Sequence, residues 1–262
     1  MTPVALSIAG SDASGGAGIQ ADLKTFHQFG VYGTSAITLI TVQNTTGVER
    51  VQCLAPDLVA QQILAVSGDI PPRAAKTGAL GNREIVETIA DLAADFAFPL
   101  VVDPVVVSKN GAVLLTPDAL DAFKLKLLPR AFLITPNLDE AGLLTGVDVG
   151  DTNAMRTAAK VLASMGPEAV LVKGGHLRGD ATDILLYRDE WFEFSAPRIQ
   201  TRHTHGTGCT YAAAITALLA CDNDLVTAMR KAKAFISEAI CTAPGLGRGC
   251  GPVNHGAVSK SD

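Results

Sequence analysis

The sequence predicts an α/β protein in which helices cover both faces of a mostly parallel sheet, an α/β/α sandwich. Short apolar segments alternate with helical patterns over most of the 262 residues. The apolar segments are continuous rather than alternating with polar residues, as expected for strands buried on both faces. Repetition of strand, helix and strand implies right-handed parallel crossovers. These observations favour a sheet enclosed between two layers of helices.

The elements follow in a regular order. Predicted strands span residues 4–9, 35–42, 74–77, 100–103, 132–135 and 169–173, and predicted helices span residues 19–29, 57–67, 84–96, 117–128 and 153–165. Residues 183–187 and 191–194 flank a polar turn, which predicts an antiparallel hairpin at one sheet edge. A helix after Cys209 and a final helix complete the pattern; the final one has apolar residues on one face, namely Leu225, Met229, Ala232, Ile236 and Ile240. No linker or repeat interrupts the chain, so we expect one domain over residues 1–262.

The composition excludes several classes of protein. Hydrophobic residues make up 48% and charged residues 18% of the chain, which excludes a disordered protein. A net charge of −5 without a Lys/Arg cluster argues against nucleic-acid binding. The sequence shows no signal peptide, no membrane span and no paired CxxC cysteines, and its five cysteines are typical of reduced thiols. We therefore expect a cytoplasmic protein that binds neither nucleic acid nor membranes.

The segment His205-Gly206-Thr207-Gly208-Cys209-Thr210 precedes an Ala/Leu-rich helical stretch. The amides of a helix's first turn lack intrahelical partners and attract anions. Gly206 and Gly208 let a phosphate approach closely, and a Cys209 thiolate would be stabilised at the same place, with a lowered pKa. We predict an anion site there, with Cys209 as base or nucleophile. The alternative is a glycine-started helix with a small buried cysteine.

A glycine-rich loop joins the first strand to the first helix, over residues 10–18. It lacks the Gly-Lys-Ser/Thr ending of a P-loop, and no ribose-binding acid follows about 20 residues later, so nicotinamide and flavin enzymes are disfavoured. The loop is better interpreted as closing over a small ligand, with Asp22 one turn into the helix. The alternative for Asp22 is a surface acid that compensates the helix dipole.

Further polar residues follow other strands, at the edge of a parallel sheet where ligands bind. Asp103 and Glu140 are candidates to hold a hydrated Mg²⁺, and Lys173 is a candidate phosphate contact. The alternative for Asn137 and Glu140 is a helix-capping arrangement. A cation site, a lysine and an anion-binding helix start together favour phosphoryl transfer.

The combined motifs resemble the hydroxymethylpyrimidine/phosphomethylpyrimidine kinase family of the ribokinase superfamily. They are Gly10-Ser11-Asp12, residues 15–25, Val42-Gln43-Asn44-Thr45, Lys76-Thr77-Gly78, residues 135–140, Val172-Lys173-Gly174-Gly175-His176 and residues 204–210. The resemblance implies a ribokinase-like fold and ATP- and Mg²⁺-dependent phosphorylation of 4-amino-5-hydroxymethyl-2-methylpyrimidine, then of its monophosphate, in thiamine biosynthesis.

The resemblance also implies roles for individual residues. Substrate-binding residues would be Gln43, which bonds the aminopyrimidine, with Asp22, Gly10, Ala17, Ala79 and Val105 around it. Lys173, Asn137 and Thr207 would face ATP, and Asp103 and Glu140 would support the metal through water. Gly206, Thr207, Gly208 and Cys209 would form the catalytic anion hole, with Cys209 at the position that an aspartate base holds in many sugar kinases.

One position departs from the family pattern. Ala79 stands where many relatives carry methionine, and a smaller residue loosens the pyrimidine pocket. A pyridoxal kinase of the same superfamily therefore stays open as an alternative, as does a non-catalytic pyrimidine-binding regulatory module. Family members are often homodimers. The sequence leaves open the oligomeric state and whether K⁺ assists.

Overall fold

The computed structural model describes residues 2–108, 111–175, 177 and 179–258. Within these residues one nine-stranded sheet forms, in the order β3-β2-β1-β4-β5-β6-β7-β8-β9. Its strands are β1 Val4–Asp12, β2 Tyr32–Asn44, β3 Gly47–Cys53, β4 Ala74–Thr77, β5 Leu100–Val102, β6 Leu133–Ile134, β7 Ala169–Val172, β8 Ala181–Tyr187 and β9 Glu190–Ala196. The pairs from β2 to β7 are parallel, and β3, β8 and β9 are antiparallel to their neighbours.

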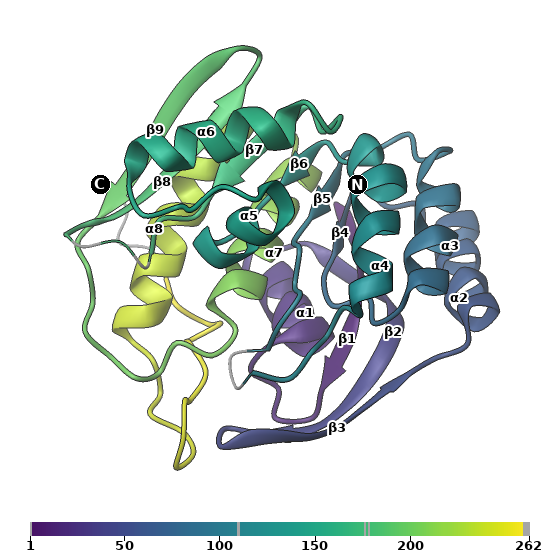
Figure 1. Ribbon diagram of the computed structural model, residues 1–262. Helices are drawn as coiled ribbons and strands as arrows, with labels where there is room; N and C mark the ends of the chain where they lie inside the picture. The colour runs from purple at the N-terminus through teal and green to yellow at the C-terminus, as the bar shows by residue number, and fades with distance from the viewer. Residues whose placement is uncertain (1, 109–110, 176, 178, 259–262) are drawn as a thin grey trace.

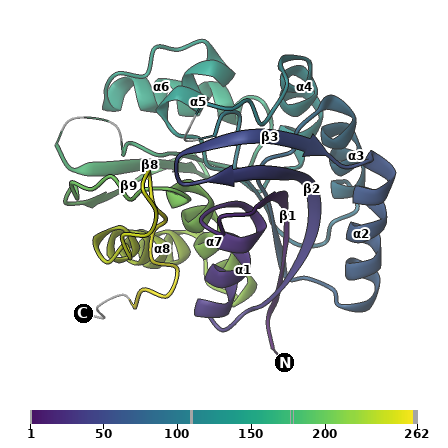
Figure 2. The same cartoon turned by 90° about the horizontal axis from the view of Figure 1, so that it is seen from below.

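Helices lie on both faces of the sheet, so the predicted three-layer sandwich is confirmed (Figure 1). One face carries α1 Gly18–Gln28, α7 Thr207–Ala220 and α8 Leu225–Cys241, and the other carries α2 Pro56–Asp69, α3 Arg83–Ala93, α4 Pro117–Ala122, α5 Leu138–Thr145 and α6 Thr152–Ala163. Figure 2, seen from below, separates the two layers. A π-helical turn at Phe123–Leu127 and a 3₁₀ turn at Leu128–Arg130 extend α4.

Each helical layer has its own hydrophobic core against the sheet. Leu6, Ile8 and Val102 point from the strands toward the α2–α6 layer, whereas Val101 and Leu171 point toward α7 and α8. All five of these side chains are fully buried. Strands buried on both faces must be apolar at successive positions, which explains the continuous apolar runs in the sequence.

The hairpin β8–β9 at one edge matches the prediction, but the opposite edge differs. There β2 continues past residue 42 and turns back as β3, so that Asn44 pairs with Gly47. Figure 2 shows this long β2–β3 ribbon along the side of the sheet. The prediction missed β3 because its residues are mostly half-buried or exposed and form no apolar run. No helix among the described residues is both long and apolar enough to cross a membrane.

Candidate active site

A cavity of about 940 Å³ opens where the parallel strands end. Residues from the ends of β1, β2, β4, β5, β6 and β7 meet there with the start of α7. Every predicted site residue except Asp22 lines this cavity. The predicted residues that line it are Gly10, Ala17, Gln43, Ala79, Asp103, Val105, Asn137, Glu140, Lys173, Gly206, Thr207, Gly208 and Cys209. His176, the last residue of the motif that begins at Val172, lies outside the described residues.

The start of α7 has the geometry of an anion site. Gly206 is the N-cap and adopts the left-handed conformation, with φ +79°. A Cβ at Gly206 would lie 1.8 Å from the carbonyl oxygen of Gly16, so only glycine fits. The amides of Gly208 and Cys209 have no acceptor among the described residues. Unpaired amides at the positive end of a 14-residue helix therefore face the cavity.

Lys173 and Asp103 lie beside these amides. The Nζ of Lys173 donates to Oδ1 of Asp103 over 3.0 Å, and the hydroxyl of Thr135 donates to the same oxygen. A Cβ at Gly208 would lie 3.4 Å from Lys173 Nζ and 3.9 Å from Asp103 Oδ2. Burial opposes the charge of Lys173, but Asp103 and Glu140 outweigh it and raise the pKa of the ammonium group. A cation thus stands directly opposite the anion-binding amides.

Asn137 and Glu140 form the capping box that was the alternative interpretation. The Asn137 amide donates to Glu140 Oε2 over 2.8 Å, and the Glu140 amide donates to Asn137 Oδ1 over 2.9 Å. Both residues nevertheless line the cavity. Burial raises the pKa of Glu140 to about 7, with Lys173 opposing and Asp103 adding to the effect. Capping and a place in the site are therefore compatible for this pair.

The residues present fit a hydrated Mg²⁺ rather than a cation enclosed by protein ligands. Asp103 Oδ2 accepts no hydrogen bond from the described residues, unlike Oδ1. Glu140 lies close enough to influence the same lysine. Across the described part of the chain, no three His, Cys, Asp or Glu side chains gather into a set that could hold a metal. Mg²⁺ at phosphate sites uses one or two carboxylates and keeps several waters, and this arrangement agrees with that.

The expected lowering of the Cys209 pKa is wrong for the free protein. Burial raises the pKa of the thiol to about 11, and Asp103 and Asp22 add to that effect. Lys76 and the amide of Gly18 oppose it without compensating it. The helix terminus is visible in the sequence, whereas the burial of the thiol and the carboxylates of Asp103 and Asp22 beside it arise only from the fold. At neutral pH the thiol is therefore protonated in the free protein.

Asp22, a predicted substrate contact, does not line the cavity. Its side chain is fully buried on the sheet side of α1. Asp22 Oδ2 accepts from Lys76 Nζ over 3.0 Å and from the Ser7 hydroxyl over 2.5 Å, and Oδ1 has no hydrogen-bond partner among the described residues. Asp22 holds the pKa of Lys76 above its usual value against the opposing effect of burial. Asp22 is thus half of a buried ion pair outside the lining of the cavity, and not a surface acid.

Replacing Lys76 by methionine is expected to lower the free energy of unfolding by about 3–5 kcal/mol, because it leaves a carboxylate buried without its partner. Urea denaturation measures the loss. Lys126→Met is the control: its ion pair with Glu87 is partly exposed, and it should change stability by less than about 1 kcal/mol. The double variant Lys76→Met/Asp22→Leu should recover most of the loss. A small effect of Lys76→Met alone would contradict the ion-pair interpretation.

Sequence reasoning gave no role to several polar residues of the cavity. Asp12 and His205 line it and bond to each other; they belong to the motifs Gly10-Ser11-Asp12 and residues 204–210. On the α8 side, Lys233 Nζ donates to Asp183 Oδ2 over 2.7 Å, and Asp183 Oδ1 accepts from the Gly174 amide. A place in the cavity could have been predicted for Asp12 from the nearby strand end, and for His205 from its neighbour Gly206. No sequence feature indicates such a place for Lys233, because it lies in a helix among apolar residues.

The region around Gln43 forms the other end of the cavity. Gly10, Ala17, Ala79 and Val105 line it with Leu39, giving a small apolar recess beside an amide side chain. A Cβ at Gly10 would lie 2.5 Å from Leu39 Cδ1, so glycine is needed for this close packing. Such a recess suits a flat heteroaromatic ring.

Comparisons with known proteins agree with this geometry. The sequence profile of the phosphomethylpyrimidine kinase family matches residues 12–254. A hydroxymethylpyrimidine/phosphomethylpyrimidine kinase of Streptomyces coelicolor is 48% identical over 254 residues, covering 97% of this chain and 94% of the relative. The crystal structure of a Clostridium difficile phosphomethylpyrimidine kinase is similar, with a TM-score of 0.81, 43% identity, and coverage of 90% of this chain and 99% of that one.

A second solved structure is similar over nearly the whole chain. It is a Bacillus subtilis pyridoxal kinase in complex with ADP, with a TM-score of 0.91, 38% identity and 98% coverage of each chain. The match to the family profile and the identity to its curated members both extend over nearly the full length. This chain therefore belongs to the phosphomethylpyrimidine kinase family.

Proposed function

We propose that this protein transfers the γ-phosphoryl group of ATP to 4-amino-5-hydroxymethyl-2-methylpyrimidine and then to its monophosphate, in thiamine biosynthesis. The names of its relatives support the reaction and the pathway. One observation carries the proposal: Lys173, Asp103 and the free amides of Gly208 and Cys209 converge at the ends of the parallel strands.

The five unpaired cysteines are typical of proteins in the reducing cytoplasm, which we propose as the location of this protein.

The phosphoryl group would lie between Lys173 and the start of α7. Phosphoryl transfer needs in-line positioning and stabilisation of the charge on the equatorial oxygens. The amides of Gly208 and Cys209 donate to those oxygens without reorganisation, and Lys173 adds a positive charge. Bound Mg²⁺ would neutralise charge on the nucleotide phosphates, held through water by Asp103 and Glu140. Asn137 and Thr207 line the same part of the cavity and would contact the nucleotide.

The pyrimidine would occupy the recess around Gln43. The amide of Gln43 can both donate to and accept from an aminopyrimidine edge. Gly10, Ala17, Ala79 and Val105 would contact the ring faces. This placement would direct the hydroxymethyl group toward Cys209, which lines the same cavity.

Cys209 would accept the proton of the substrate hydroxyl. Only the thiolate can do so, and with a pKa of about 11 roughly one thiol in ten thousand is ionised at pH 7. Lys76 and the Gly18 amide are the groups that favour the thiolate. The second phosphorylation differs, because a phosphate monoester is already largely ionised at neutral pH and has no hydroxyl proton to lose. Cys209 is therefore needed in the first step and dispensable as a base in the second.

Incubation of the purified protein with ATP, Mg²⁺ and the pyrimidine alcohol should yield its monophosphate and then its diphosphate, detected by mass spectrometry. Pyridoxal is the competing substrate to assay beside it, since a pyridoxal kinase shares the fold closely and Ala79 leaves space in the recess. If kcat/KM is higher for pyridoxal than for the pyrimidine alcohol, pyridoxal is the preferred substrate and the proposed one is wrong. Pyrimidine binding without any ATP turnover would contradict a catalytic role.

A further inference from the structure

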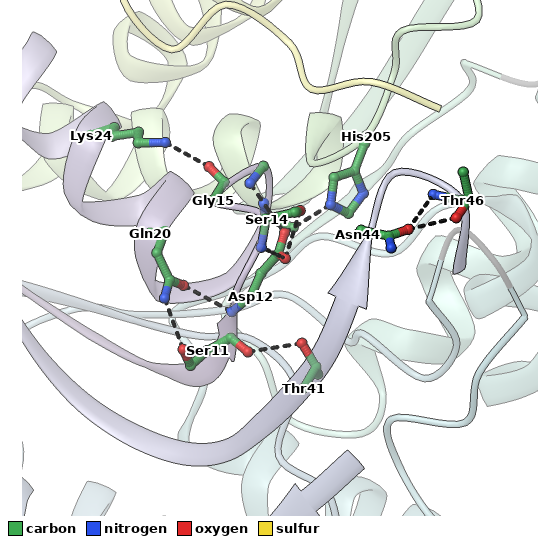
Figure 3. Close-up of polar contacts among 12 residues, drawn as sticks. Ser11, Asp12, Ser14, Gly15, Gln20, Lys24, Thr41, Asn44, Thr46 and His205 are labelled. Atoms are coloured by element: carbon green, nitrogen blue, oxygen red, sulfur yellow. Dashed lines mark hydrogen bonds and ion pairs between the residues drawn. The ribbon is translucent and has the colours of Figure 1, made fainter. Parts of the chain in front are cut away.

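Asp12 is the centre of a hydrogen-bond cluster at the end of β1 (Figure 3). Its Oδ1 accepts from the amide and the hydroxyl of Ser14, over 2.8 and 2.7 Å. Its Oδ2 accepts from the amides of Gly16 and Ala17, over 3.1 and 2.8 Å. Nε2 of His205 lies 2.8 Å from the same Oδ2. One carboxylate therefore fixes the glycine-rich loop and also reaches a residue 193 positions away in the chain.

These contacts leave the carboxylate no capacity for a ligand. A carboxylate offers about four lone-pair positions, and Asp12 already faces five donors. Its side chain is 3% exposed. Burial acts against its charge, but hydrogen bonds from His205 and Ser14 hold the pKa of Asp12 well below the usual range. The hydrogen bonds that Asp12 makes in the described part of the chain thus all go to the protein itself.

His205 connects this cluster to the anion site. It directly precedes Gly206, the N-cap of α7. The His205 amide donates to the Gly251 carbonyl over 3.0 Å, and the Val253 amide donates to the His205 carbonyl. The backbone of His205 is therefore fixed by the C-terminal segment, and its ring is fixed by Asp12.

The two loops also touch directly. A Cβ at Gly16 would lie 2.4 Å from His205 Cδ2, and a Cβ at Gly206 would lie 1.8 Å from the Gly16 carbonyl oxygen. No gap therefore separates the loop that carries Ala17 from the turn that starts α7. A shift of either loop must displace the other, because tightly packed atoms cannot yield independently.

We propose that the Asp12–His205 pair is a positioning device. It sets the anion-hole amides of α7 at a fixed distance from the glycine-rich loop over residues 10–18, which carries the pyrimidine contact Ala17. The inference rests on the proposed function, since it assigns the hydroxyl and the phosphoryl group to those two loops. The pair touches neither reacting atom. It acts through Gly16 and Ala17 on one side and through Gly206 and Gly208 on the other.

Loss of the pair should lower kcat while nucleotide binding stays nearly constant. A misplacement of about 1 Å costs on the order of 10²-fold in rate, and we expect that order of loss in Asp12→Asn and His205→Ala. The KM for ATP should change less than about threefold, because of the nucleotide contacts only Thr207 lies on the displaced segment, and Lys173 and Asn137 lie on other elements. His205→Gln, which keeps a side-chain N–H donor, should recover part of the rate lost in His205→Ala.

Two further variants guard against simple loss of folding. Gly16→Ala removes no hydrogen-bonding group and needs no positive φ, but its Cβ would displace the His205 ring. It should reproduce the fall in kcat. Asp151→Asn is the matched control: Asp151 caps α6 outside the cavity, and asparagine preserves the cap. The double variant Asp12→Asn/His205→Ala should be no slower than the slower single variant, because both changes break one link.

Hydrogen exchange separates this inference from the proposed function. In Asp12→Asn and His205→Ala, amide hydrogen exchange should rise together in residues 14–17 and 206–210. This result does not depend on whether the protein phosphorylates the pyrimidine. If amide exchange rises in both loops of the variants but the wild-type protein does not phosphorylate the pyrimidine, the proposed function is refuted and the coupling of the two loops still holds. An exchange increase confined to one loop, or a kcat per folded molecule within twofold of wild type, would overturn the positioning role. Rate losses that multiply in the double variant would also overturn it.

Discussion

Cys209→Ala is expected to lower kcat for the pyrimidine alcohol by about 10²–10⁴-fold, the range that a placed general base contributes. Phosphorylation of the monophosphate should fall by less than about tenfold, since its nucleophile is already ionised at neutral pH. Separate initial-rate assays with each substrate measure the two effects. The structure supports this division because Cys209 contributes a backbone amide to the anion site, which survives the substitution, and a side chain, which does not.

Cys221→Ala is the control for Cys209→Ala, because Cys221 is exposed at the opposite end of α7. It should leave both rates unchanged. The pH dependence gives an independent check. With a thiol pKa of about 11, the thiolate fraction rises tenfold per pH unit between about pH 7 and 10. The wild-type kcat/KM for the alcohol should rise with pH accordingly, whereas the rate for the monophosphate should not. Equal losses on both substrates in Cys209→Ala would contradict the base role.

Gly208→Val is expected to lower kcat on both substrates by about 10²–10³-fold, because the added side chain would push the phosphoryl group away from the amides, and losing one oxyanion-type hydrogen bond costs about that much. Its side chain would project toward Lys173 Nζ and Asp103 Oδ2, which lie 3.4 and 3.9 Å from a Cβ at this position. That is the space assigned to the transferring phosphoryl group. Steady-state kinetics should show kcat falling further than the affinity for ATP.

The structure explains why Gly208 is the cleaner test of the anion site. Among the described residues a Cβ at Gly208 meets no atom closer than 3.4 Å, and Gly208 needs no positive φ, so the backbone accommodates a side chain at this position. Gly206→Ala would instead collide with the Gly16 backbone and strain a positive φ, which confuses catalysis with folding. Gly68→Val is a matched control, because Gly68 lies exposed in α2 with open space around it. Normal turnover in Gly208→Val would contradict the placement of the phosphoryl group.

The sequence predicted the layers and the edge of the sheet at which the cavity opens. Both follow from local rules: continuous apolar strands are buried on both faces, and the ends of parallel strands meet at one edge. That rule brought Asp103, Asn137 and Lys173 into one cavity although up to 70 residues separate them. The edge strand β3 was missed because an exposed antiparallel strand needs no apolar pattern.

The errors concern groups whose surroundings come from distant parts of the chain. The pKa of Cys209 depends on burial and on Asp103 and Asp22, which come near it only in the folded protein. Asp22 faces inward because Lys76, 54 residues away, supplies the opposite charge. The same reason hid the Asp12–His205 pair, whose members lie in separate motifs. Local sequence identifies which residues carry chemistry, and tertiary contacts decide their ionisation and partners.

The central claim is that the amides at the start of α7, opposite Lys173, bind the phosphoryl group during transfer. The most direct measurement is a crystal structure with ADP, Mg²⁺, the pyrimidine alcohol and a planar fluoride mimic of the transferring group. The account predicts the mimic within hydrogen-bonding distance of the Gly208 and Cys209 amides and of Lys173 Nζ, with the hydroxymethyl oxygen on its far side from ADP. A mimic bound away from the start of α7 would contradict it.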